Sequence, residues 1–205
     1  GRICRVKTVI EHITTDVYKR TFQIQSAHVI VLLIVGRKKQ DITVTVRLTR
    51  EGSSAVIIGL VKGDNSDAIV LRTLQYHGSR ETTSNLLVKS LLADAASFTY
   101  DGAIRVEPKA QKTDAYQRNE NLLLSPLAHA ESKPKLEILA NDVRCTHGAT
   151  IGSVREDELW YLASRGIDKE RATALIAQGF LRSVVDRIAD ERAKHRVYAF
   201  IEDVV

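Results

Sequence analysis

The chain has 205 residues, of which 44% are hydrophobic and 27% charged, and its 30 Lys and Arg residues outnumber its 25 Asp and Glu residues to give a net charge of +5. This length and hydrophobic content suffice for one large or two small folded domains, which excludes a disordered chain. Aromatic residues make up only 5% and the positive surplus is scattered, so we expect no nucleic-acid binding.

The cysteine content and the longest apolar run restrict the compartment. The chain has two cysteines, far apart in sequence and with no signal peptide, so we expect no disulfide framework and a cytoplasmic location. The apolar run 29–35 is too short for a membrane helix, which needs about 20 residues, and predicts a buried strand. Gly1 stands where an initiator Met would be and no Met occurs, so we expect a processed or truncated chain.

The first third of the chain has the pattern of short β-strands. After the apolar run 29–35, Ile42-x-Val44-x-Val46-x-Leu48 alternates with a period of two, which is typical of a strand with one buried face. Polar segments at 36–41, 51–54 and 63–67 separate these runs and have the Gly, Asn and Asp residues of turns. This part of the chain is therefore predicted to be all-β.

An internal repeat indicates what kind of β-structure follows. The segment beginning Asn85-Leu86-Leu87 resembles the one beginning Asn121-Leu122-Leu123, and another apolar run, Ile104-Arg105-Val106, lies halfway between them. A unit of about 18 residues suits one coil of a β-solenoid. We therefore expect Leu86, Ile104 and Leu122 to form one inward-facing ladder. A β-sandwich is the alternative, because regularly spaced strands also suit that fold.

The pattern becomes helical after Gly152. Ser153-Val154-Arg155-Glu156 has the form of a capping box, Gly166 suits a helix C-terminus and Asp168 suits the start of the next helix. We therefore predict two domains, a β-domain over 1–152 and a helical domain over 153–205 that covers an end of the solenoid. Core packing is the expected role of the aromatic residues of this domain, which include Trp160, Tyr161, Phe180 and Phe200.

Cys145 and His147 form the best candidate for chemistry. They stand two residues apart in a strand-like segment, so alternation places a thiol and an imidazole side by side on one face. Three interpretations are open: metal ligands, a nucleophile with its base, or a packed strand pair without chemistry. Two cysteines are too few for a complete iron-sulfur site within this chain, because such clusters generally take four thiolates.

The second half of the chain contains five ordered strings: Ala110-Gln111-x-Thr113-Asp114-Ala115-Tyr116-Gln117, Asn119-x-Asn121-Leu122-Leu123-Leu124-Ser125, Lys133-Pro134-x-Leu136-Glu137-Ile138, Asp142-Val143-x-Cys145-x-His147-Gly148-Ala149-Thr150-x-Gly152 and Leu159-x-Tyr161-Leu162-x-Ser164-Arg165-Gly166-Ile167. Together these strings resemble the C-terminal signature of the SufB/SufD family, the scaffold proteins of the SUF iron-sulfur cluster assembly system, and are closer to SufD. A string of this length is far more specific than a short motif.

The resemblance implies a right-handed parallel β-helix followed by a small C-terminal helical domain, in a non-catalytic SufD-like scaffold subunit. It implies pairing with SufB through the β-helix, or a homodimer formed the same way, and docking of the ATPase SufC near Arg165, Gly166 and Ile167. It also implies a transient iron-sulfur cluster shared with the partner chain, with His147 as an iron ligand and Cys145 as a weaker one. The alternative function is a carbohydrate-active β-helix enzyme, which requires a pair of aligned carboxylates.

Overall fold

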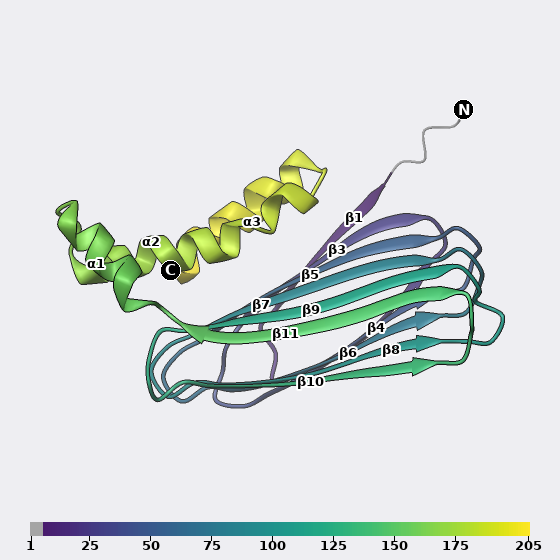
Figure 1. Cartoon of the computed structure of the whole chain (residues 1–205), viewed down its shortest axis with the longest axis horizontal. Helices are drawn as coiled ribbons and strands as arrows, with labels where there is room; N and C mark the ends of the chain where they lie inside the picture. The colour runs from purple at the N-terminus through teal and green to yellow at the C-terminus, as the bar shows by residue number, and fades with distance from the viewer. Residues whose placement is uncertain (1–5) are drawn as a thin grey trace.

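The structure is a computed structural model that describes residues 6–205, so Gly1 and Cys4 lie outside the described residues. Eleven strands form two sheets in which every pairing is parallel (Figure 1). The first sheet holds the odd-numbered strands β1 (Lys7–Ile13), β3 (Ala27–Val35), β5 (Ser54–Gly63), β7 (Thr83–Leu92), β9 (Thr113–Leu123) and β11 (Val143–Ser153). The second sheet holds the even-numbered strands β2 (Val17–Ile24), β4 (Gln40–Leu48), β6 (Ala68–His77), β8 (Ser97–Val106) and β10 (His129–Ile138).

The chain alternates between the two sheets, so each coil consists of one odd-numbered and one even-numbered strand. Each strand then pairs in parallel with the equivalent strand of the coil before it. The predicted parallel β-helix is confirmed, and the alternative of a β-sandwich is wrong, because a sandwich is built of antiparallel sheets.

The predicted coil of 18 residues is wrong. In the later coils, partner residues lie about 30 positions apart, as in Ser54 and Thr83 or Asn85 and Tyr116. The two Asn-Leu-Leu runs are therefore not equivalent, because Asn121 stands five positions beyond the true partner of Asn85, and an odd offset reverses the face of a strand.

The expected inward ladder fails for the same reason. Leu86 lies in the interior cluster, Leu122 in a second cluster on the outer face of β9, and Ile104 in the opposite sheet.

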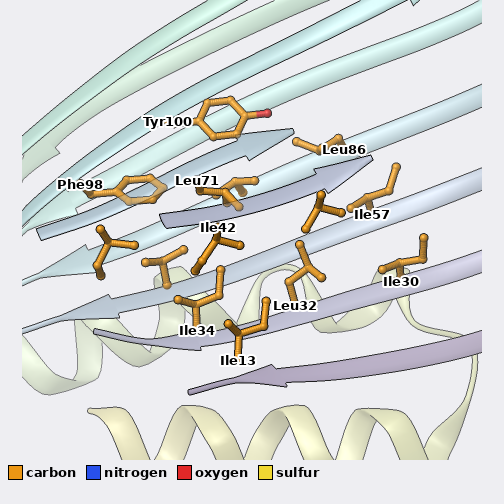
Figure 2. Close-up of a cluster of buried hydrophobic side chains, with 14 of the residues drawn as sticks. Ile13, Ile30, Leu32, Ile34, Ile42, Ile57, Leu71, Leu86, Phe98 and Tyr100 are labelled. Atoms are coloured by element: carbon orange, nitrogen blue, oxygen red, sulfur yellow. The ribbon is translucent and has the colours of Figure 1, made fainter. Parts of the chain in front are cut away.

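Large aliphatic side chains fill the interior between the sheets (Figure 2). They stack in ladders, because parallel in-register strands place equivalent residues of successive coils on the same face. Ile30, Ile57 and Leu86 form one such ladder in the first sheet. Ile42, Leu71 and Tyr100 form another in the second sheet. Burial of these side chains supplies the main stabilisation of the solenoid, at about 1.5–3 kcal/mol for each.

Helices follow the last strand: α1 (Glu156–Ser164), α2 (Lys169–Arg182), the short 3-10 helix η1 (Val185–Arg187) and α3 (Glu191–Val204). The change from strand to helix falls close to the predicted boundary at residue 152. The predicted capping box is wrong, because Ser153 ends β11 and α1 begins after Arg155 without a side-chain cap. The other two predicted caps are present. Gly166 has a φ of +80° just beyond α1, and Asp168 Oδ1 accepts a hydrogen bond of 2.9 Å from the Arg171 amide.

The helices cover the outer face of the first sheet and not an end of the solenoid (Figure 1). This corrects our expectation, and it explains why the run 29–35 in β3 is apolar without interruption. Val29, Val31 and Leu33 point outward into a cluster with α2, η1 and α3, while Ile30, Leu32 and Ile34 point into the solenoid. A strand buried on both faces has no alternation. Within residues 6–205, no helix combines the length and apolarity that crossing a membrane requires.

A buried lysine fixes α2 to the sheet. Lys89 projects from the outer face of β7, where its Nζ donates a hydrogen bond of 2.9 Å to the Phe180 carbonyl oxygen and lies 2.7 Å from Glu120 Oε2. The ammonium group also lies 4.1 Å from the centre of the Phe180 ring. Because Phe180 is in the last turn of α2, the positive charge also interacts favourably with the helix dipole.

The predicted core role of the aromatic residues holds only in part. Phe200 of α3 is buried and Phe180 of α2 is half-buried, both against the sheet. Trp160 and Tyr161, however, are 75% and 56% exposed. The helix that carries them, α1, contributes no buried residue, because α2 and α3 already cover the apolar face.

The buried His77 should make stability depend on pH. Its ring nitrogens lie 2.8 Å from Thr82 Oγ1 and 2.8 Å from Ser84 Oγ inside the solenoid, and burial lowers its pKa from 6.5 to about 4. Between pH 6.5 and about 4, His77 binds a proton in the unfolded chain but stays neutral in the folded chain. The free energy of unfolding therefore decreases as the pH drops from about 6.5 towards 4. The loss should reach about 3 kcal/mol, at about 1.4 kcal/mol for each pH unit.

We expect His77→Gln, which stays neutral, to flatten this dependence. Urea unfolding of both proteins at pH 7 and pH 4.5 gives the loss of stability of each protein between the two pH values. Subtracting one loss from the other cancels the contribution of the carboxylates, which the two proteins share. Equal losses of stability in the two proteins would contradict the assignment to His77.

Candidate functional site at the open end of the solenoid

The last coil, β10 with β11, leaves the interior of the solenoid open. Among residues 6–205 no further strand pairs with β11 or β10, each of which ends its sheet. Leu136 and Ile138 of β10 continue the ladders of Ile104 and Val106, yet both are 38% exposed, and Ile151 of β11 is 49% exposed. We call these three residues and the last coil around them the open end. An exposed apolar surface built on two free strand edges is typical of a site where another chain adds.

Cys145 and His147 lie in this open end, on the predicted shared face of β11. They are the Cα partners of Ala115 and Gln117, which are buried inside the solenoid. Both side chains therefore stand on the interior side of the sheet, one coil above a buried layer. Cys145 packs against the cluster around Ile104 and is half-buried, whereas His147 is exposed.

The surroundings distinguish the two candidate ligands. Burial, and to a smaller extent the charge of Asp114, raise the pKa of the Cys145 thiol. A raised pKa disfavours the thiolate, which is the form that attacks carbonyls and binds metals. His147, in contrast, is exposed to solvent. His147 is therefore the more accessible of the two candidate ligands, and Cys145 is a poor nucleophile.

The pair by itself would not complete a metal site. No group of three or more His, Cys, Asp or Glu side chains suited to a metal ion occurs in the described part of the chain. Cys145 and His147 together supply two ligands, so a tetrahedral iron would need the rest from elsewhere. The exposure of His147 at a free strand edge leaves room for them.

Amide side chains of β9 line the interior one coil below β11, and the sequence alone assigned them no role. Asn119 and Asn121 of β9 form a reciprocal pair, in which Asn121 Nδ2 donates to Asn119 Oδ1 at 2.8 Å, and Ser90 Oγ donates to Asn121 Oδ1 at 2.7 Å. Gln117 completes the row but has no hydrogen-bond partner among the described residues. Alternating polar residues in β9 were the available signal. The sequence alone would place these polar residues on the solvent face. Only the pairing of β9 with β7 and β11 shows that they face the interior.

A second surface lies on α1, the helix that follows β11. Trp160 and Tyr161 are exposed, and the Arg165 guanidinium lies 5.4 Å from the centre of the Tyr161 ring. We call these three residues the α1 surface. Beside it, Tyr161, Ile176 and three further residues line a shallow groove of about 440 Å³. The predicted partner-binding residues Arg165, Gly166 and Ile167 form the adjoining turn between α1 and α2.

Comparisons with known proteins agree on one family. Residues 2–180 match the family model of the SufBD core domain of SUF system FeS cluster assembly. The chain is 35% identical over 155 residues to the iron-sulfur cluster assembly protein SufD of Escherichia coli, which covers 76% of this chain and 37% of that protein. It is 31% identical over 150 residues to SufD of Bacillus subtilis, covering 73% of this chain and 33% of that protein.

A third relative matches a larger share of the chain. The chain is 32% identical over 180 residues to an iron-sulfur cluster assembly SufBD family protein of Mycobacterium leprae, covering 84% of this chain and 46% of that protein. The chain thus spans less than half the length of each of these relatives.

Proposed function

The chain belongs to the SufBD family, on its SufD side, and we propose that it is a non-catalytic scaffold subunit of an iron-sulfur cluster assembly complex. In this proposal it pairs with a SufB-like scaffold through the open end and docks a SufC-like ATPase through the helical domain. The family match provides no support for the alternative function, a carbohydrate-active enzyme.

The observation that carries the proposal is the position of His147. His147 is exposed and stands on the interior side of an edge strand. The same open end also exposes the apolar side chains of Leu136, Ile138 and Ile151. A partner that continues the two sheets would cover Leu136 and Ile151 and bring its own side chains to His147. The metal centre would then be completed between the chains.

The cluster is cargo that passes through this interface rather than a resident cofactor. His147 offers a ring nitrogen to iron, and the partner supplies the thiolates, since nitrogen and sulfur donors are the usual ligands of such sites. Cys145 plays a weaker part, because its raised pKa keeps the thiol protonated. Transient sharing between chains is consistent with a site that this chain only half provides.

The α1 surface is the proposed dock for the ATPase. It consists of Trp160, Tyr161 and Arg165, which are residue types enriched at the energetic centres of interfaces. Trp160 and Tyr161 are exposed, and no residue of α1 is buried within this chain. The turn formed by Arg165, Gly166 and Ile167 adjoins them. We also propose a cytoplasmic location, and SufB as the partner in preference to a second copy of this chain.

Pairing at the open end is tested by adding charge to it. We expect Ile151→Lys to weaken binding to a SufB-type subunit about tenfold. The reason is that transferring an unpaired ammonium group from water into an apolar interface is unfavourable. Val17→Lys is the matched control, because Val17 is an exposed valine of β2, in the first coil. Affinity of purified subunits, followed by anaerobic reconstitution and a spectrum, gives the readout. Equal binding by Ile151→Lys, Val17→Lys and the unmodified chain would refute pairing at this end.

A further inference from the structure

Gln117 is a buried amide that lacks hydrogen bonds. It is 1% exposed, and neither its Nε2 nor its Oε1 has a partner among residues 6–205. Leaving such a group unsatisfied costs roughly 1–3 kcal/mol, and buried polar groups in native proteins nearly always have a partner. The position of Gln117 in the ladder indicates which group that partner is.

Gln117 occupies the fifth position of a ladder that changes character along the solenoid. The first four positions are aliphatic and are filled by Val9, Ile30, Ile57 and Leu86. Gln117 follows, and His147 is the sixth position, the last among the described strands. Adjacent strands lie about 4.8 Å apart, so neighbouring side chains on one face are within reach of each other. Below Gln117, Leu86 offers no polar atom, whereas above it His147 offers two ring nitrogens.

The opposite wall of the solenoid is shaped to hold this amide. Gly102 of β8 faces it, and a Cβ atom on Gly102 would lie only 2.4 Å from Gln117 Nε2 and 2.4 Å from the Tyr100 hydroxyl oxygen. The missing side chain at Gly102 therefore makes the space in which the amide lies. The Tyr100 hydroxyl already pairs with Thr73 Oγ1 at 2.8 Å. Nε2 lies towards Gly102, so Oε1 is the atom left for a donor.

We propose that Gln117 is a positioning residue for His147, whose ring N–H donates a hydrogen bond to the amide oxygen. The exposed His147 side chain reaches Oε1 by rotation about its own bonds. The hydrogen bond fixes one tautomer and leaves the other ring nitrogen, with its lone pair, directed at the open end. Metal-binding histidines almost always donate their second ring N–H to such an acceptor. The hydrogen bond stands on its own, and only its importance for iron rests on the proposed function.

The tautomer of His147 provides the direct test, in the full chain without iron. Labelling histidine with ¹⁵N gives long-range proton–nitrogen NMR spectra that report which ring nitrogen holds the proton, and the His147→Ala spectrum identifies the signal. At about pH 8.5, where ordinary imidazoles are neutral, we expect one dominant tautomer. Gln117→Met, which keeps the length without the amide, should give a mixture. Gln117→Glu, which keeps an acceptor, should restore the single tautomer.

A matched control separates His147 from the other neighbour of the amide. Tyr100→Phe removes the hydroxyl beside Nε2 and should leave the His147 tautomer unchanged. The proposal is overturned if Gln117→Met leaves the tautomer unchanged. It is also overturned if Tyr100→Phe alters the tautomer as much as Gln117→Met does. If Gln117→Met does not fold, Gln117→Asn replaces it, because the asparagine side chain is too short to reach His147. An unchanged His147 tautomer in Gln117→Asn would then overturn the proposal.

Iron binding measures the consequence. Ferrous iron titrated anaerobically into the complex with a SufB-type subunit should bind roughly 10- to 100-fold more weakly after Gln117→Met, with recovery in Gln117→Glu. If His147→Ala abolishes binding while Gln117→Met does not weaken it, the positioning role is wrong. If His147→Ala itself has no effect on iron, the proposed function of His147 is wrong, and the tautomer experiment alone decides on the hydrogen bond.

Discussion

His147→Ala is expected to remove most of the iron-sulfur cargo from the reconstituted complex and to leave the fold and the pairing intact. The loss follows from the position of the imidazole, which is exposed at a free strand edge and is the more accessible of the two candidate ligands in the open end. Loss of one ligand from a four-ligand site should reduce iron and sulfide content at least tenfold, by analogy with the effect of removing even an outer-shell partner. Iron and sulfide analysis with an absorption spectrum after anaerobic reconstitution measures it.

Cys145→Ser and thermal unfolding serve as controls. Cys145→Ser should reduce cargo less than His147→Ala does, because the half-buried thiol has a raised pKa. The stability of His147→Ala should lie within about 0.5 kcal/mol of the unmodified chain, as for most surface substitutions. Normal cargo in His147→Ala, within a complex that still assembles, would remove the metal-ligand role and leave this chain as architecture alone.

The sequence predicted the fold class but not the length of a coil. Runs of β-branched residues such as 29–35 indicate strands from local preference, and the change to a helical pattern after residue 152 is equally local. The register between coils is set by partners about 30 residues apart, as in Leu86 and Gln117. Similar strings at a different spacing, such as the two Asn-Leu-Leu runs, mimic a repeat without being one.

For the site, alternation placed Cys145 and His147 on one face, but only the fold shows which side that face takes. The exposure of His147 and the partial burial of Cys145 depend on β11 being the last described strand of its sheet. In the sequence, Gln117 stands out only as part of a family string, because the space that its buried side chain fills depends on Gly102 from another strand. Interior polar residues of a solenoid look like ordinary strand-surface residues in sequence.

Trp160 shows the opposite error, in which a residue expected in the core lies at the surface. Large aromatic side chains are usually well buried, and the apolar spacing of 159–162 suits an amphipathic helix. That expectation fails because α2, η1 and α3 already fill the outer face of the first sheet. The helix α1 is left outside with 75% of Trp160 exposed. A tryptophan that contributes so little to its own fold is available to another protein.

Trp160→Ser should weaken binding of a SufC-type ATPase by roughly 30-fold or more, since an aromatic residue at the centre of an interface typically contributes 2 kcal/mol or more. The effect arises at the interface itself, because no residue of α1 is buried within this chain. Affinity measured by calorimetry or by surface-based binding with the purified ATPase gives the value. The unfolding midpoint of Trp160→Ser should match that of the unmodified chain.

Two further variants determine whether the loss is specific. Trp160→Phe retains a large apolar ring and should keep most of the affinity, which distinguishes burial of the ring from a change in helix stability. Ile151→Lys alters only the open end, so it should bind the ATPase normally while losing the SufB-type subunit, and Trp160→Ser should show the reverse. Because the α1 surface and the open end belong to different parts of the fold, a variant of either one that weakens both interactions would indicate general unfolding. Normal ATPase binding by a folded Trp160→Ser protein would show that the α1 surface is not the dock.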